Sequence, residues 1–135
     1  MLLALQRWSM DQHLTPDELD RARGLETNFS NCIASINDLY SYRKEVLASR
    51  TLHPEGATIF SAVQVIADET HLPTSMAERV LWTLLREQEK HHDQMAEELI
   101  RRGKCSETFV AYVNGMKAQI SGSEAWSRTT PRYVV

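Results

Sequence analysis

The stretch NDLYSYRKE, residues 37–45, lies near the end of a long helical pattern and places polar side chains at four-residue intervals. Residues four apart share one face of an α-helix, because each residue turns the chain by about 100°. Asn37, Ser41 and Glu45 therefore fall within about 80° of one another, and Lys44 returns to the same side. The stretch predicts a helix face that carries three oxygen ligands and one cation.

This set of ligands has the chemistry of a weak chelate for a hard cation. Glu45 is the only one of the three oxygen ligands with a formal charge. Mg²⁺ prefers octahedral oxygen coordination and commonly takes its remaining ligands from substrate phosphates. We therefore expect a Mg²⁺ ion that binds together with a phosphorylated ligand, with Mn²⁺ as an alternative ion. For a lone N-x-x-x-S-x-x-x-E pattern, an ordinary solvated helix face would be the better interpretation.

The whole nine-residue stretch, with Asp after the Asn, two tyrosines, and a lysine before the final glutamate, resembles the second metal-binding motif of class I terpene synthases. The resemblance implies that Asn37, Ser41 and Glu45 bind one Mg²⁺ ion. It also implies that Lys44 contacts the diphosphate of a prenyl diphosphate substrate. The form of the motif is similar to that of fungal and bacterial sesquiterpene synthases, which implies farnesyl diphosphate.

The end of the chain, EAWSRTTPRYVV at residues 124–135, supplies a second and independent match. It resembles the W-S-x-x-x-x-R-Y segment that closes the same family. The resemblance implies that Arg132 and Tyr133 donate hydrogen bonds to the diphosphate when the active site closes. A guanidinium offers a planar fork to phosphate oxygens, and a phenol adds a donor without charge. Pro131 cannot continue a helix and predicts an extended approach for this pair.

Length and composition are those of a soluble globular protein with a single domain over residues 1–135. Hydrophobic residues make up 42% of the chain and charged residues 24%, which argues against disorder. A net charge of −3 without a dense basic run argues against nucleic acid as a partner. The apolar opening, residues 1–5, is too short for a signal peptide or a membrane span. We expect a cytoplasmic protein with two reduced cysteines, Cys32 and Cys105.

Turn residues divide the first half of the sequence into helical segments. A short helix is expected over residues 2–11. A capping box formed by Thr15 and Glu18 predicts the start of a long helix that reaches about residue 49. After a loop at residues 51–56, the apolar pattern predicts a helix over residues 57–71.

The second half shows the same organisation. A capping box at Ser75 and Glu78 predicts a helix that ends near residue 102, where Gly103 can terminate it. Ser106 is expected to cap a last helix that ends between residues 121 and 126. Because no convincing strand pairs are visible, the fold is predicted to be all-α, an antiparallel helix bundle. The resemblance identifies this bundle with the C-terminal portion of the class I terpenoid synthase fold.

Three apolar side chains are candidates for the wall of a hydrocarbon pocket. Phe29 and Ile33 lie one to two turns before Asn37, on or near its helix face, and Trp126 precedes the Arg-Tyr pair. The resemblance implies that such residues border the hydrocarbon part of the substrate. For Phe29 and Ile33 taken singly, burial in the protein core is the alternative interpretation.

Glu87 and His91 offer a different kind of metal site, because they stand four residues apart in a polar run. Two such side chains can share a zinc ion. Lysine, arginine and glutamine residues surround the pair, as they would on a solvated helix face, and this pattern argues against zinc.

The Asp-rich motif that holds two further Mg²⁺ ions in class I terpene synthases has no counterpart here. Residues 17–20, Asp-Glu-Leu-Asp, come nearest, but they start a helix and their spacing is wrong. The resemblance therefore covers only the C-terminal half of the family's catalytic domain. It implies a terpene synthase that ionises and cyclises a prenyl diphosphate with release of diphosphate, although the isolated chain would lack half of the site.

The alternative is a non-catalytic helical fragment that keeps half of a diphosphate and Mg²⁺ site. Removing half of a helix bundle would leave apolar surface uncovered. Such surface favours association, and we expect a homo-oligomer in that case.

Overall fold

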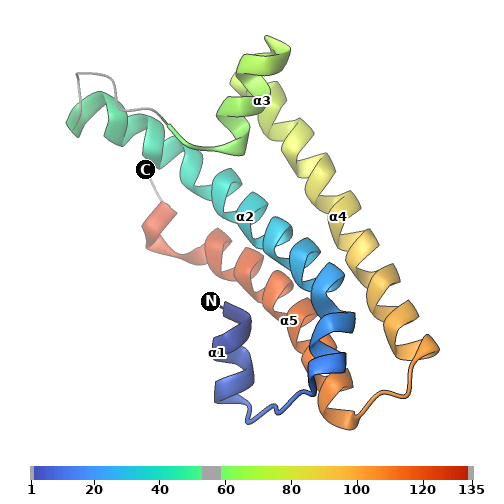
Figure 1. Cartoon of the computed structure of the whole chain (residues 1–135). Coiled ribbons are helices and arrows are strands. Elements are labelled where there is room, and N and C mark those ends of the chain that lie inside the picture. Colours follow the sequence, from blue (N-terminus) through green and yellow to red (C-terminus); the bar gives the residue numbers. More distant parts are fainter. Residues whose placement is uncertain (1, 53–58, 134–135) are drawn as a thin grey trace. The chain divides into compact units, whose positions relative to one another are not determined.

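The computed structural model describes residues 2–52 and 59–133, and the regular structure in these ranges is helical (Figure 1). The elements are α1 (Leu2–Ser9), α2 (Pro16–Leu52), α3 (Ala62–Thr70), α4 (Thr74–Arg102), α5 (Glu107–Thr129) and the 3₁₀ turn η1 (Pro131–Tyr133). No strand occurs within the described ranges, so the prediction of an all-α fold is confirmed. None of these helices combines the length and the apolar character that crossing a bilayer requires.

The chain forms two compact units, and α2, α4 and α5 each contribute a segment to both. The first unit comprises Met1–Cys32 and Gln88–Gly122, and the second comprises Ile33–Glu87 and Ser123–Val135. Within each unit, α4 runs antiparallel to α2 and α5 (Figure 1). The antiparallel arrangement of α4 and α5 follows from the short connection between them.

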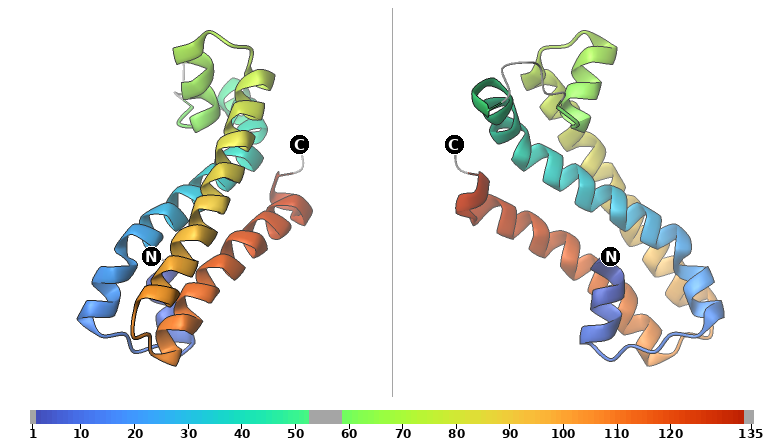
Figure 2. Two further views of the ribbon diagram at one scale, coloured as in Figure 1. Left: turned by 90° about the vertical axis from the view of Figure 1, so that its right-hand side faces the viewer. Right: turned by 60° about the vertical axis from the view of Figure 1, so that its left-hand side comes forward.

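Tyr112 of α5 is the fully buried centre of the first unit, and it fixes α1 in place. Its hydroxyl donates to Glu26 of α2 and accepts from Arg7 of α1, with heavy-atom distances of 2.5 and 2.9 Å. The side-chain amide of Gln6 donates to the Tyr112 carbonyl at 3.1 Å. These contacts hold α1 alongside the first turns of α5 (Figure 2). Burial raises the pKa of the Tyr112 phenol, so this residue remains a neutral donor.

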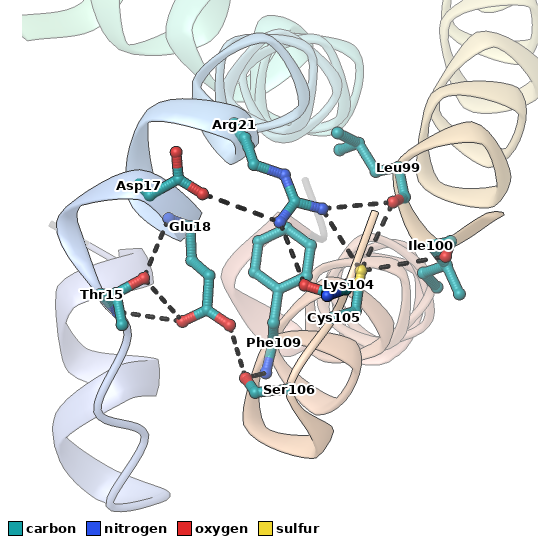
Figure 3. A network of polar contacts seen from close by, with 10 residues as sticks. All are labelled: Thr15, Asp17, Glu18, Arg21, Leu99, Ile100, Lys104, Cys105, Ser106 and Phe109. Carbon is teal, nitrogen blue, oxygen red and sulfur yellow. Dashed lines mark hydrogen bonds and ion pairs between the residues drawn. The ribbon is translucent and has the colours of Figure 1, made fainter. Parts of the chain in front are cut away.

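The predicted capping box at the start of α2 is present (Figure 3). The Thr15 amide donates to the Glu18 carboxylate at 2.9 Å, and the Glu18 amide donates to the Thr15 hydroxyl at 3.2 Å. The Ser106 hydroxyl donates to the same carboxylate at 2.6 Å and accepts from the Phe109 amide at 3.0 Å. These hydrogen bonds, with that of Ser106 the largest cause, lower the pKa of Glu18. Glu18 therefore serves the N-termini of both α2 and α5.

The predicted end of the fourth helix is also confirmed, because α4 stops at Arg102, directly before Gly103. The guanidinium of Arg21 occupies this corner, 5.0 Å from the ring centroid of Phe109 (Figure 3). It donates to the Leu99 and Lys104 carbonyls at 3.5 and 3.4 Å. A Cβ atom on Gly103 would come within 1.9 Å of the Arg21 guanidinium. The lack of a side chain on Gly103 therefore leaves room for the end of Arg21, which a larger residue would displace.

In the second unit, α3 packs on α2 around a small apolar core. The buried members of this core are Tyr42, Val63, Ala67, Ala77 and Leu81. The Asp38 carboxylate accepts from the Ala62 amide at 2.7 Å, at the positive end of the α3 dipole. The Tyr42 hydroxyl donates to the Gln64 side chain at 2.8 Å. Two residues of the stretch 37–45 thus attach α3 to the helix that carries the predicted metal ligands.

Four predicted details of the helices are wrong. The third helix begins at Ala62, because Ser61 is extended and caps it. Phe60, an apolar residue inside the predicted range, is 90% exposed, and residues 57 and 58 lie outside the described part. Ser75 lies inside α4, which already begins at Thr74, so it forms no capping box. The last helix continues to Thr129, and the segment from Pro131 forms a 3₁₀ turn instead of an extended approach. Proline at the first position of such a turn loses no hydrogen bond that the turn requires.

His92 of α4 is buried in the first unit, with only 1% of its surface exposed. Neither of its ring nitrogens has a hydrogen-bond partner among the described residues. Burial lowers the pKa of His92 from its usual 6.5; of the charged neighbours, Asp93 raises it, whereas Lys117 and His91 lower it.

We expect the free energy of unfolding to fall as the pH decreases below 6.5, the usual pKa of histidine. Because the folded pKa is depressed, the unfolded chain binds the proton first, in a window that opens at pH 6.5 and extends down to the folded pKa. Within that window the loss is at most about 1.4 kcal/mol per pH unit. Urea unfolding at several pH values measures it. His92→Gln should flatten the profile and His91→Gln, an exposed neighbour, should not; equal slopes in all three proteins would contradict the assignment.

Candidate metal and diphosphate site

The three predicted metal ligands lie in the second unit on one helix, α2. Ser41 is buried, Glu45 is half-buried and Asn37 is exposed. The Ser41 hydroxyl donates to Glu45 Oε1 at 2.5 Å, so these two oxygen ligands are already adjacent. The hydroxyl keeps its lone pairs, and the carboxylate keeps a second oxygen, for a cation. This donor set, together with the Asn37 amide oxygen, fits a hard, oxygen-preferring ion such as Mg²⁺.

The two predicted motifs meet in the folded chain. The Tyr133 hydroxyl donates to Asn37 Oδ1 at 3.0 Å, although the residues are 96 positions apart in the sequence. The turn η1 carries Tyr133 back toward α2 after α5 ends at Thr129. A predicted diphosphate donor and a predicted metal ligand are therefore in direct contact.

The other two predicted diphosphate contacts, Lys44 and Arg132, are both exposed. Lys44 lies on α2 next to Glu45. The Arg132 guanidinium lies 5.7 Å from the ring centroid of Tyr133. Both cations are thus accessible to an anionic ligand, and Arg132 lies beside the Tyr133 ring that contacts Asn37.

The three predicted pocket residues have different surroundings. Trp126 is 51% exposed and meets the Tyr133 ring edge to face, with centroids 5.9 Å apart. Ile33 is partly buried in the second unit. Phe29 is buried in the first unit. Trp126 is the one of the three that contacts a predicted diphosphate residue, and a pocket-wall role stays a prediction for all three.

Five further side chains, for which the sequence motifs predict no role in binding, form a closed series of contacts next to this site. We call them the Glu124 cluster: Tyr40 of α2, Trp82 and Arg86 of α4, and Glu124 and Arg128 of α5. Glu124 accepts two hydrogen bonds from Arg86, each at 2.8 Å, and one from Arg128 at 2.9 Å. The Arg86 guanidinium lies 5.1 Å from the Trp82 ring centroid, and Trp82 meets Tyr40 edge to face at 5.8 Å. Arg128 closes the series beside Tyr40: both side chains line one cavity, and the Tyr40 hydroxyl is the largest cause that raises the pKa of Arg128.

The electrostatic centre of the cluster is a buried carboxylate. The hydrogen bond from Arg86 is the largest cause that lowers the pKa of Glu124, burial opposes it, and Arg128 adds a smaller lowering. The four-residue spacing of Glu124 and Arg128 was the one local signal available in the sequence. Arg86 lies 38 positions from Glu124, so no sequence pattern pointed to their pairing.

A polar cavity of about 280 Å³ adjoins the cluster and the ring of Tyr133. Its lining includes Tyr40, Arg43, Trp82, Arg128 and Tyr133. Arg43 pairs with Glu78 across the cavity at 3.8 Å. Cations, phenols and aromatic rings therefore gather on the side of α2 that adjoins the predicted metal face.

The zinc alternative gains no support. Among the described residues, no group of three or more His, Cys, Asp or Glu side chains is arranged to hold a metal ion. His91 is exposed on α4. Cys32 and Cys105 are both free thiols, as expected.

Comparison with known proteins agrees with the motifs. Residues 1–91 match the family model "Terpene synthase family 2, C-terminal metal binding". Aristolochene synthase from Penicillium roqueforti is 46% identical over 98% of this chain, and that from Aspergillus terreus is 41% identical over all of it. Talaropentaene synthase from Talaromyces verruculosus is 30% identical over 97% of the chain. The chain spans 39% and 42% of the two aristolochene synthases and 19% of the last protein.

The crystal structure of aristolochene synthase from Penicillium roqueforti matches with a TM-score of 0.82 and 40% sequence identity. The match covers 96% of this chain and 41% of that enzyme. The predicted correspondence with the C-terminal portion of the class I terpenoid synthase fold is therefore confirmed. Family model, sequence identity and fold agree, and the chain belongs to terpene synthase family 2, of which it carries the C-terminal, metal-binding part.

Proposed function

We propose that the chain supplies one side of the Mg²⁺ and diphosphate site of a sesquiterpene synthase that ionises and cyclises farnesyl diphosphate with release of diphosphate. The observation that carries this proposal is the 3.0 Å hydrogen bond from Tyr133 to Asn37. It joins the two motifs at one place, where a metal-bound diphosphate would need ligands from both. The names of the aristolochene synthases support a sesquiterpene product class.

In this proposal Asn37, Ser41 and Glu45 would hold the ion, with Mn²⁺ as an alternative to Mg²⁺. The chemistry that Mg²⁺ supplies when bound is neutralisation of charge on the phosphoryl oxygens. Lys44 and Arg132 bring positive charge to the departing diphosphate, and stabilisation of charge that develops in the transition state lowers the barrier.

The hydrocarbon side of the reaction needs a surface that tolerates a carbocation. Trp126 presents an aromatic ring beside Tyr133, and an indole face attracts cations. The Tyr133 hydroxyl has a single proton. When a diphosphate binds, the hydroxyl would therefore either break its hydrogen bond to Asn37 or share the proton between Asn37 and a diphosphate oxygen. The phenol therefore links occupation of the diphosphate site to the geometry of a metal ligand.

Calorimetry with Mg²⁺ and inorganic diphosphate tests this function on the chain itself. We expect weak binding of either ligand alone and tighter binding of each in the presence of the other, because only one ligand of the ion is charged. Arg132→Gln should weaken Mg²⁺-dependent diphosphate binding by about tenfold, since it removes a charge-assisted donor.

The matched control is Arg23→Gln, which removes an exposed guanidinium that pairs with Asp20 in the first unit. This variant should bind diphosphate as the unmodified chain does. Diphosphate binding that is independent of Mg²⁺, or equal in the Arg132 and Arg23 variants, would refute the proposed function.

Association without catalysis is the second candidate, and an apolar groove in the first unit favours it. The groove lies between α1 and α5, encloses about 480 Å³, and includes Trp8, which is 82% exposed, and Met10. Exposed apolar surface of this kind promotes self-association. Light scattering on the purified chain distinguishes the candidates: a monomer at all concentrations, together with Mg²⁺-dependent diphosphate binding, would exclude association.

A further inference from the structure

The turn η1 has little anchorage of its own, although it carries the two predicted C-terminal diphosphate donors. None of its residues is buried. Its backbone is held by two long hydrogen bonds: the Tyr133 amide donates to the Thr130 carbonyl at 3.5 Å, and the Arg132 amide donates to the Thr130 hydroxyl at 3.4 Å. The position of Tyr133 therefore depends on what its side chain contacts.

The ring of Tyr133 lies between two aromatic neighbours. Its centroid is 6.4 Å from that of Tyr40, with the planes tilted by 34°, and 5.9 Å from that of Trp126. Aromatic pairs at these separations attract each other beyond simple burial. Trp126 is itself half exposed, so Tyr40 is the firmer of the two neighbours.

Tyr40 is fixed from two sides by the Glu124 cluster. Trp82 meets its ring edge to face, and Arg128 lines the same cavity and interacts with its hydroxyl. Arg128 is in turn oriented by Glu124, which also binds Arg86 through both carboxylate oxygens. A paired fork of this kind fixes the plane of the carboxylate as well as its distance.

The contacts of the Glu124 cluster thus hold Tyr40 next to Tyr133, whose own turn is anchored only weakly. We propose that Tyr40, held by Arg128 and Glu124, positions the Tyr133 phenol against Asn37, so that Tyr40 is a positioning residue of the diphosphate site. This inference rests on the proposed function, in which Tyr133 donates to the diphosphate. Tyr40 touches neither metal ligand nor substrate in this scheme, and it acts through Tyr133.

Tyr40→Phe tests the inference because it keeps the ring and removes only the hydroxyl that interacts with Arg128. We expect Mg²⁺-dependent binding of inorganic diphosphate to weaken about fivefold. Tyr42→Phe is the matched control, since that hydroxyl lies on the same helix and donates to Gln64 of α3, away from Tyr133. The control should bind diphosphate with unchanged affinity.

A double-mutant cycle separates positioning from a merely structural role. Tyr133→Phe removes the phenol that is to be positioned, so adding Tyr40→Phe to it should weaken diphosphate binding no further. Additive effects of the two substitutions would overturn the inference. So would a Tyr40→Phe variant that binds diphosphate normally.

Fluorine NMR of the chain labelled with fluorotyrosine gives a readout that needs no ligand. The chain has four tyrosines, and the Tyr133 signal is identified by its loss in Tyr133→Phe. In Tyr40→Phe this signal should move toward that of a solvated tyrosine, and in Tyr42→Phe it should stay in place. An unchanged Tyr133 signal in Tyr40→Phe would refute the positioning role.

The two proposals can therefore fail separately. If the unmodified chain shows no Mg²⁺-dependent diphosphate binding, the proposed function fails, and the Tyr133 signal still decides whether Tyr40 positions it. If binding occurs but Tyr40→Phe changes neither affinity nor signal, the function stands and the positioning role fails.

Discussion

Glu45→Gln should abolish Mg²⁺-dependent diphosphate binding, with an expected loss on the order of 100-fold or more. Glu45 provides the one formal negative charge among the three proposed ligands, and Mg²⁺ gives up its water reluctantly to neutral donors. The substitution keeps the shape of the side chain. The Ser41 hydroxyl, which donates to Glu45 at 2.5 Å, can still donate to the amide oxygen of the glutamine. The effect should therefore be on the charge of the site and not on the fold.

Glu69→Gln is the matched control, because it makes the same change in net charge at an exposed position on α3. Calorimetry with Mg²⁺ and inorganic diphosphate should show the unmodified affinity for this variant. Thermal unfolding of both variants checks that the fold is intact. Equal diphosphate affinities for Glu45→Gln and the unmodified chain would disprove the assignment of Glu45 as a metal ligand.

Phe109→Ala should lower the free energy of unfolding by about 3–5 kcal/mol. Phe109 is fully buried in the first unit, so its removal loses apolar burial and leaves a cavity. It also removes the ring that lies 5.0 Å from the Arg21 guanidinium. Arg21 would then keep its carbonyl partners but lose the aromatic face beneath it.

Phe60→Ala provides the control for the same substitution at the surface, since Phe60 is 90% exposed. Its effect on the free energy of unfolding should stay within about 0.5 kcal/mol. Urea unfolding followed by circular dichroism measures both variants. A loss below about 1 kcal/mol for Phe109→Ala would contradict the full burial of this side chain in the first unit.

Helix starts and ends were predictable from the sequence where the signal is local. The capping box at Thr15 and Glu18 involves residues three apart, and its hydrogen bonds are formed as expected. The end of α4 at Arg102 was predictable in the same way, because Gly103 follows it directly. The start of α3 was misjudged because Phe60 continues an apolar pattern, whereas the actual cap, Ser61, is fixed by its hydrogen bond to the Val63 amide.

The candidate site was predictable only through its motifs. Asn37, Ser41 and Glu45 share a face because of helix geometry alone. The contact of Asn37 with Tyr133 depends on how the chain continues after α5. Pro131 predicts an extended segment there, whereas the chain forms the 3₁₀ turn η1. Neither the pairing of Arg86 with Glu124 nor the packing of Trp82 on Tyr40 leaves a periodic signal, because such contacts join helices that are distant in sequence.

The carboxylate of Glu18 has a consequence for cooperativity. One oxygen completes the first turn of α2 through Thr15, and the other accepts from Ser106, whose hydroxyl caps α5. The two helix starts lie far apart in the chain but share this single group (Figure 3). Fraying of either start breaks the hydrogen bond between Ser106 and Glu18, so each start loses a partner of its capping residue when the other opens. The stabilities of the two helix starts are therefore coupled.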